Sequence, residues 1–308
     1  MESDFDWIRH SDFPDPQWRD FRFKTLLEMV CFGKDASNAG RPILIGVVGG
    51  QQSIISLADL QLAIRSADRW RVQQNLSVGS RVMLVRLPYC SELVIAVNAL
   101  ALMAIGLSVV LPAEGASEDI ENLLMRSGSQ RLLYPIDDSG QQFNRQVTIA
   151  ADRLCSLAQR LELPECSLPV PFPIRGEVGS ERREFRLDQG TITPDSEVEG
   201  TKMCEQLDAP KNQTISREVL VLTTSASSGT PKLVRYSERA LLTVAESWQA
   251  AGFFDREVTG GQSLCPLLSH SMGMRNVLHA VWTRQPTLMI PPEWLQEAPH
   301  RALQLLQD

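Results

Sequence analysis

A run of small, hydroxylated residues that ends in a lysine is the part of this sequence best suited to chemistry. Residues 223–232 read TTSASSGTPK. Small residues let backbone N–H groups approach an anion closely, and successive N–H groups in a turn favour negative charge. The hydroxyl groups add donors, and Lys232 adds a full positive charge. Composition alone favours a Ser/Thr-rich surface loop over a phosphate site, and both interpretations stay open at this point.

The elements expected around this run favour a phosphate cradle. A buried strand is predicted over residues 219–224 and a helix over residues 238–252, so the loop would join a strand to a helix. The pattern is not that of a Walker A loop, which needs lysine directly after glycine, because Lys232 lies three residues after Gly229.

Residues 224–232 resemble the phosphate loop of the adenylate-forming superfamily, which holds acyl-CoA synthetases, nonribosomal peptide adenylation domains and luciferases. The family pattern is T-S-G-(S/T)-T-G-x-P-K-G, and Ala226, Ser228 and Leu233 depart from it. The resemblance implies that ATP phosphates, bridged by Mg²⁺, are held by the following loop residues: Thr224, Ser225, Ser227, Ser228, Gly229, Thr230 and Lys232.

A second segment resembles the same family. Residues 266–274 read PLLSHSMGM and are similar to its P-x-x-H-x-x-G segment, with one extra residue before His270. In the family this histidine or aromatic lies beside the substrate carboxylate and the α-phosphate. The resemblance implies that His270 and Lys232 are the catalytic residues, although a histidine taken alone is more often structural. A diffuse resemblance over residues 92–112 supports the fold only.

Strands that alternate with helices must position these residues. The predicted elements before residue 135 are a hairpin over 42–55 that turns at Gly49-Gly50, a helix from 56 to about 75 with Ser56 and Asp59 at its start, a strand over 79–87, a helix over 91–105, a strand over 107–111, a helix over 117–126 and a strand over 131–134. This alternation predicts an α/β fold. Further strands are predicted over 263–268 and 287–290, and helices over 273–282 and 298–307.

The chain is predicted to contain two βαβ-type subdomains with mostly parallel sheets covered by helices, as in the large N-terminal domain of adenylate-forming enzymes. The first subdomain is assigned to residues 1–162, a loop-rich connector to residues 163–215, and the start of an incomplete second subdomain to residues 216–308. The family's C-terminal lid, with its catalytic lysine, is not found before Asp308, so the chain is interpreted as the N-terminal portion of such an enzyme.

Composition excludes several other classes of protein. The hydrophobic fraction is 43%, the charged fraction is 22% and the formal net charge is -7, without a basic run that would bind nucleic acid. Residues 93–113 carry no charge, but a buried helix followed by a strand is favoured over a membrane span. The six cysteines form no CxxC pair, and no metal-ligand spacing surrounds His270 or His279, so a cytoplasmic protein without a structural metal is expected.

The resemblance implies a ligase that activates a small carboxylic acid as an acyl-adenylate. Coenzyme A, or the phosphopantetheine of an acyl or peptidyl carrier protein, would then take the acyl group. The alternative is a truncated, non-catalytic relative that binds a nucleotide or a partner protein, and the reading frame beyond residue 308 would discriminate between the two. Fatty, aromatic and amino acids all stay open as substrates.

Overall fold

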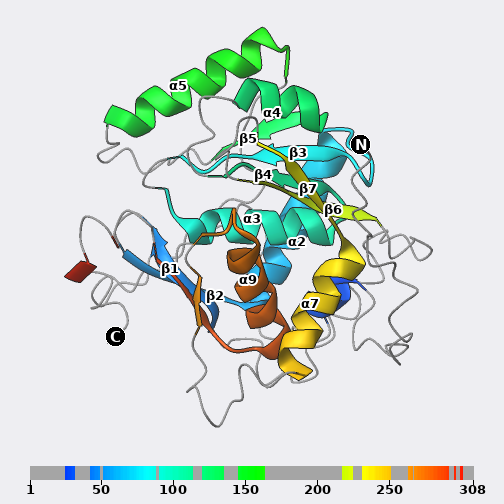
Figure 1. The fold of residues 1–308 in the computed structure, drawn as a ribbon, viewed down its shortest axis with the longest axis vertical. Helices are drawn as coiled ribbons and strands as arrows, with labels where there is room; N and C mark the ends of the chain where they lie inside the picture. The colour runs from blue at the N-terminus through cyan, green and yellow to red at the C-terminus, as the bar shows by residue number, and fades with distance from the viewer. Residues whose placement is uncertain are drawn as a thin grey trace, which may run out of the picture.

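The helices and strands form two sheets with helices between and outside them (Figure 1). A computed structural model describes the following residues: 25–31, 42–48, 51–87, 90–113, 120–134, 145–163, 217–224, 231–250, 263–265, 267–290, 295 and 299–300. Most of the predicted helix over 298–307 and nearly all of the predicted connector over 163–215 lie outside these residues.

The larger sheet has five strands in the order β5-β3-β4-β6-β7. Its strands are β3 (Arg81–Leu84), β4 (Ser108–Leu111), β5 (Arg131–Leu133), β6 (Glu218–Thr223) and β7 (Leu233–Ser237). The first four in spatial order are parallel, and β7 is an antiparallel edge strand. The predicted run of parallel strands with helical connections is therefore confirmed.

The smaller sheet has the order β2-β1-β9-β8. Its strands are β1 (Pro42–Val48), β2 (Gln51–Ser56), β8 (Ser263–Cys265) and β9 (Thr287–Met289). The predicted hairpin is confirmed, because β1 and β2 pair antiparallel, whereas β9 pairs parallel with both β1 and β8. Each sheet thus combines strands that come before residues 163–215 with strands that come after them.

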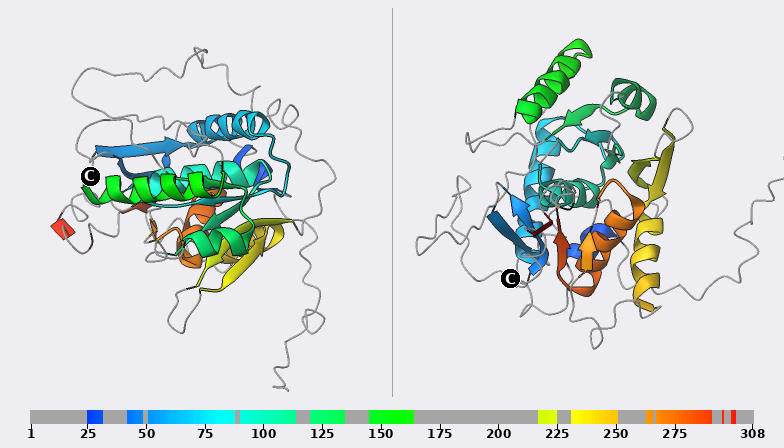
Figure 2. Two further views of the ribbon diagram at one scale, coloured as in Figure 1. Left: turned by 90° about the horizontal axis from the view of Figure 1, so that it is seen from above. Right: turned by 60° about the vertical axis from the view of Figure 1, so that its left-hand side comes forward.

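Helices cover both faces of the larger sheet (Figures 1 and 2). The helices are α1 (Leu26–Cys31), α2 (Leu57–Gln73), α3 (Glu92–Ala104), α4 (Ile120–Ser127), α5 (Arg145–Arg160), α7 (Glu238–Ala250) and α9 (Ser271–Thr283). Helices α4 and α5 share one apolar cluster with one face of the sheet, and α2 and α3 share a second cluster with the opposite face. Side chains of a strand alternate between faces, which is why neighbouring residues such as Val82 and Met83 enter different clusters.

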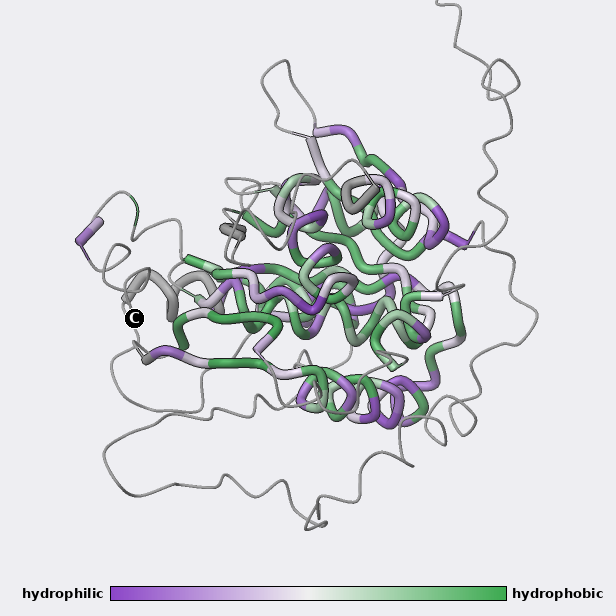
Figure 3. Tube along the Cα trace, turned by 90° about the horizontal axis from the view of Figure 1, so that it is seen from below, coloured by the Kyte–Doolittle hydropathy of each residue, from purple (hydrophilic) through white to green (hydrophobic). Residues whose placement is uncertain are grey.

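Helix α3 is buried on all sides because it contacts β4 of the larger sheet and β1 of the smaller one. The approach to β1 is close: a Cβ added at Gly46 would lie 2.9 Å from the Cβ of Leu93. The hydrophobic stretches accordingly run through the middle of the molecule (Figure 3). The predicted buried helix is confirmed, and among the described residues no helix has the length and apolar character that a membrane span needs.

The ends of the helices follow from local sequence. Ser56 caps α2 with a capping box, in which the Ser56 Oγ accepts from the Asp59 amide at 3.2 Å and Asp59 accepts from the Ser56 amide at 2.9 Å. After α3, Gly106 adopts φ +91°, a left-handed conformation that favours glycine, and the chain turns directly into β4.

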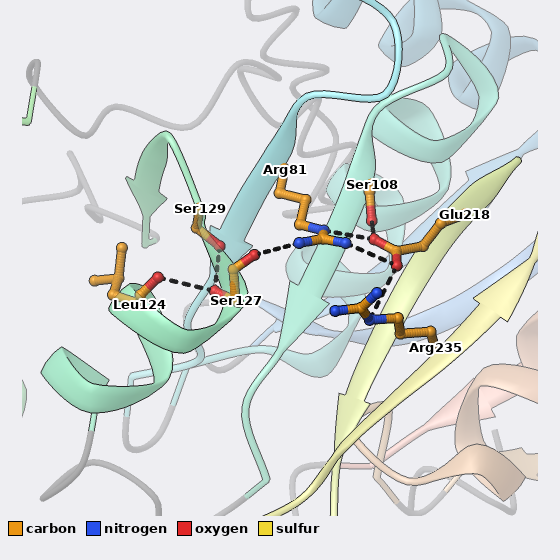
Figure 4. A network of polar contacts seen from close by, with 7 residues as sticks. All are labelled: Arg81, Ser108, Leu124, Ser127, Ser129, Glu218 and Arg235. Carbon is orange, nitrogen blue, oxygen red and sulfur yellow. Dashed lines mark hydrogen bonds and ion pairs between the residues drawn. The ribbon is translucent and has the colours of Figure 1, made fainter.

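A charged network holds the strands of the larger sheet together at their amino-terminal ends (Figure 4). The Arg81 guanidinium donates two hydrogen bonds to Glu218, at 2.6 and 3.1 Å, and the Ser108 hydroxyl donates a third at 2.7 Å. Burial alone raises the pKa of Glu218, but these bonds and the charges of Arg81 and Arg235 outweigh it, so the pKa lies below its ordinary value. The network joins β3, β4, β6 and β7.

Candidate functional site

The base of the predicted phosphate loop is closed by hydrogen bonds between the ends of β6 and β7. The Thr224 amide donates to the Lys232 carbonyl at 2.9 Å, and the Lys232 amide donates to the Thr224 Oγ1 at 3.0 Å. Because the Oγ1 accepts this bond, the hydroxyl hydrogen of Thr224 stays available to donate to a ligand. The other predicted members of the loop lie outside the described residues: Ser225, Ser227, Ser228, Gly229 and Thr230.

The predicted helix is confirmed as α7 (Glu238–Ala250), but the predicted direct step from loop to helix is wrong, because a strand lies between them. Strand β7 comes first, pairs antiparallel with β6, and places the start of α7 at its far end. Five residues of strand separate the loop from Glu238, a length of about 16 Å. The phosphates of a ligand at the loop would therefore not face the N-terminus of α7. The strand is only five residues long and does not alternate regularly between buried and exposed positions, so its sequence lacks the pattern that predicts a strand.

Leu233, which replaces a glycine of the family pattern, has a defined place in this arrangement. It is the first residue of β7, pairs with Thr223, and packs against the apolar cluster beneath α4 and α5. A leucine suits this extended strand position.

Two contacts with segments outside the predicted loop fix its base, and neither of them is predicted from the sequence. The Thr223 Oγ1 accepts a hydrogen bond from the Ala113 amide at 2.6 Å, which ties the segment after β4 to the end of β6. The Arg126 Nη1 donates to the Pro231 carbonyl at 2.9 Å. Such contacts join segments far apart in the sequence, and only the tertiary structure brings these partners together.

The loop base lies at the carboxyl edge of the parallel strands. β6 runs parallel to β4, and β4 runs parallel to β3, so the segments that follow all three strands leave the sheet at one edge. In open α/β sheets, ligands bind at this edge. The charged network around Glu218 lies at the opposite edge, where it stabilises the strands without approaching the loop.

His270 is exposed and is the N-cap residue of α9. Its amide donates to the Leu267 carbonyl at 3.2 Å, and its own carbonyl accepts from the Met274 amide at 3.2 Å. No hydrogen bond from its side chain caps the helix. The imidazole is thus presented to solvent by the backbone of a tight turn that spans Leu267 to His270.

That turn lies directly on the first turn of α9. A Cβ added at Gly273 would stand 1.8 Å from the Leu267 carbonyl oxygen and 3.0 Å from the Leu268 nitrogen. Glycine is therefore required here for close approach of two backbone segments. This gives a physical reason for the glycine in the segment PLLSHSMGM.

The His270 turn is also tied to the carboxyl edge of the larger sheet. The Leu268 amide donates to the Glu92 Oε2 at 3.2 Å, and the Glu92 Oε1 lies 3.0 Å from the Nε of Arg86, two residues after the end of β3. Strands β3 and β6 flank β4, so their ends stand about 10 Å apart. The fold thus brings the His270 turn and the loop base that carries Lys232 to the same edge.

His279 differs from His270 in its surroundings. It is buried within α9, at 2% exposed, and burial lowers the pKa of its imidazole from 6.5 to about 4. Across the part of the chain that the structure describes, no three His, Cys, Asp or Glu side chains gather in a way that could hold a metal ion. His279 is therefore a core residue that stays neutral at physiological pH.

Comparison with known proteins gives matches in structure and none in sequence. No family model matches the chain, and no curated protein matches it by sequence. One similar structure is a fatty acid AMP ligase from Legionella pneumophila. The match covers 92% of this chain and 42% of the ligase, at 14% identity and a TM-score of 0.63. Another is the adenylation domain of a keto acid-selecting NRPS module, bound to keto acyl adenylate. That match covers 92% of this chain and 45% of the other, at 16% identity and a TM-score of 0.60.

A third structure is o-succinylbenzoate CoA synthetase from Bacillus subtilis in complex with an acyl-adenylate intermediate. The match covers 91% of this chain and 59% of the synthetase, at 13% identity and a TM-score of 0.55. The chain therefore has the fold of the N-terminal part of adenylate-forming enzymes. It spans less than half the length of the ligase and of the adenylation domain, at 42% and 45%.

Proposed function

We propose that this protein takes part in the activation of a carboxylic acid by ATP. The carboxylate oxygen would form a bond to the α-phosphorus, the bond to the bridging oxygen would break, and pyrophosphate would leave with the electron pair. The observation that carries this proposal is the closed loop base ending in Lys232, at the same sheet edge as the His270 turn, in a fold shared with enzymes of this chemistry.

The residues of this chain would contribute by binding and positioning. Lys232 is exposed at the end of the loop and would place its ammonium against the β- and γ-phosphates. Thr224 would donate its hydroxyl hydrogen to a phosphate oxygen while its oxygen keeps the loop base closed. His270 would lie beside the carboxylate and the α-phosphate and orient them for attack.

Mg²⁺ fits this arrangement as an ion held chiefly by the nucleotide. Within the described ranges no cluster of three acidic, histidine or cysteine side chains could bind it alone. Mg²⁺ in nucleotide sites is usually held by phosphates, waters and one or two protein carboxylates. When bound, it would neutralise charge on the phosphates.

The acyl acceptor is proposed to be a thiol, either coenzyme A or the phosphopantetheine of a carrier protein. Both kinds of protein occur among the similar structures, since one is a CoA synthetase and another an NRPS adenylation domain. Those two proteins are named for a keto acid and for o-succinylbenzoate, so the acid used here stays open. We further propose a cytoplasmic protein whose chain is organised as two subdomains around residues 163–215.

Exchange of labelled pyrophosphate into ATP, measured with a broad panel of carboxylic acids, tests this function. We expect acid-dependent exchange that falls about 100-fold or more in Lys232→Met, because a charge that stabilises the transition state is lost. Arg235→Met is the matched control, since this cation lies three residues further along the chain, on β7, and contacts Glu218 at 3.4 Å. Its exchange should stay within about twofold of the parent protein.

Two results would contradict the proposal. One is the absence of exchange with every acid, and saturable ATP binding in that case would favour a non-catalytic nucleotide-binding protein. The other is equal exchange in the Lys232→Met variant and the parent protein.

A further inference from the structure

A buried carboxylate connects the first residue of α3 with the turn that presents His270. The Glu92 side chain is only 3% exposed, and its two oxygens face different segments. Its Oε1 lies 3.0 Å from the Arg86 Nε, just after β3, and its Oε2 accepts from the Leu268 amide at 3.2 Å. Leu268 is 176 residues away in the sequence, so this bond is a tertiary contact between the two halves of the chain.

The position of His270 depends on this turn. The imidazole makes no capping bond to α9, so the backbone of the turn decides from which point of the surface the side chain extends. On one side the turn rests on Gly273, where no side chain would fit. On the other side the Glu92 carboxylate holds the Leu268 amide. These two contacts fix the turn between α9 and the carboxyl edge of the larger sheet.

We propose that Glu92 is a positioning residue for the adenylation site. It holds the His270 turn at a fixed distance from the end of β3, and hence from the loop base at the end of β6. Arg86 pairs with the charge so that the carboxylate can be buried. This inference rests on the proposed function, because it assigns His270 to that site.

Stability alone does not explain why this ion pair is buried. A buried ion pair can often be replaced by apolar side chains without loss of stability. Such a replacement would leave the Leu268 amide without its acceptor, whereas a glutamine at position 92 would keep an acceptor oxygen. The two replacements therefore separate the hydrogen bond to the turn from the ion pair itself.

Three forms of the full 308-residue chain test the inference: the parent protein, Glu92→Gln, and the double variant Arg86→Met/Glu92→Leu. Hydrogen exchange of the Leu268 amide is compared with that of the Val110 amide, which lies in the central strand β4 and reports global unfolding. We expect exchange at Leu268 to accelerate about 10- to 100-fold relative to Val110 in the double variant, and by less than about threefold in Glu92→Gln.

Pyrophosphate exchange provides the catalytic measurement. In the double variant kcat should fall about 10- to 100-fold while the KM for ATP stays within about twofold, because the loop base is unchanged and only the His270 turn moves. The Glu92→Gln variant should recover most of this loss. A merely structural role would not produce that difference between kcat and KM or its recovery by glutamine.

The inference and the proposed function fail in different ways. A parent protein without exchange refutes the proposed function, and with it the role of Glu92 at that site. Equal protection of Leu268 in the double variant and the parent overturns the positioning role even where exchange activity is found. A Glu92→Gln variant as impaired as the double variant overturns it as well.

Discussion

Replacing Gly273 by alanine is the sharpest test of how the His270 turn is built. The added Cβ would stand 1.8 Å from the Leu267 carbonyl oxygen, whereas real Cβ contacts below 3.0 Å are essentially absent from proteins. The turn would have to move by roughly 1.2 Å, the difference between those distances. The atom in the way belongs to the backbone, so it cannot rotate aside as the end of a flexible side chain would.

We expect Gly273→Ala to lower the free energy of unfolding by about 3 kcal/mol, the upper end of the range for inserting a methyl group into a packed site. Alanine's better helix propensity, worth about 1 kcal/mol over glycine, is included in that net value. Urea unfolding followed by circular dichroism gives the quantity directly from the midpoint and slope.

Two control variants separate the clash of the added Cβ from other causes of a loss of stability. Met272→Ala changes the preceding residue, which is 48% exposed, and should alter stability by less than about 0.5 kcal/mol. Gly79→Ala adds a Cβ where nothing lies within 4 Å but φ is +86°, so it should cost about 1 kcal/mol from backbone strain alone. A Gly273→Ala protein as stable as Met272→Ala would refute the proposed close approach of the turn to α9.

Three further predictions concern the core and the amino-terminal edge of the larger sheet. The unfolded chain protonates His279 below pH 6.5, whereas the folded chain does so only near pH 4, so stability should fall by roughly 3 kcal/mol as the pH drops through this window. In urea titrations of His279→Leu at the same pH values, the free energy of unfolding should not show this pH-dependent loss. Arg81→Met should cost about 1–2 kcal/mol at neutral pH, because a bidentate partner of Glu218 is lost. Arg235→Met, whose side chain is 60% exposed, should cost less than about 0.5 kcal/mol, and equal losses in the two arginine variants would contradict this. The Asn98 Oδ1 is buried without a hydrogen-bond partner among the described residues, so Asn98→Leu should raise the thermal midpoint, and a lower midpoint would show that the amide is needed.

Much of the fold could be predicted because its signals are local. Helix α3 is apolar at nearly every position, and only burial between two layers suits such a helix. The box formed by Ser56 and Asp59 starts α2, and Gly106 ends the segment of α3 through its left-handed φ. In each case the physical cause acts within a short stretch of the chain, so it can be recognised in the sequence without knowledge of the tertiary contacts.

The loop base was only partly predictable. Residues 223–232 stand out by their composition and by their resemblance to the family's phosphate loop, but no strand is predicted between them and the helix that begins at Glu238, where the structure has β7. β7 is an edge strand with exposed side chains, and what stabilises it is pairing with β6. Pairing depends on the neighbouring strand and leaves little trace in the residues of the edge strand itself.

What the sequence determined by itself, then, was the set of chemical groups and the alternation of elements: a hydroxyl-rich loop with Lys232, a histidine segment with its glycine, and strands separated by helices. Tertiary structure alone decided which strands became neighbours, and it placed β4 between β6, which leads into the loop base, and β3, which ends two residues before Arg86. It also decided that Glu92 reaches Leu268. Long-range contacts of this kind arise from packing of whole elements, whose energies depend on surfaces that no short segment possesses alone.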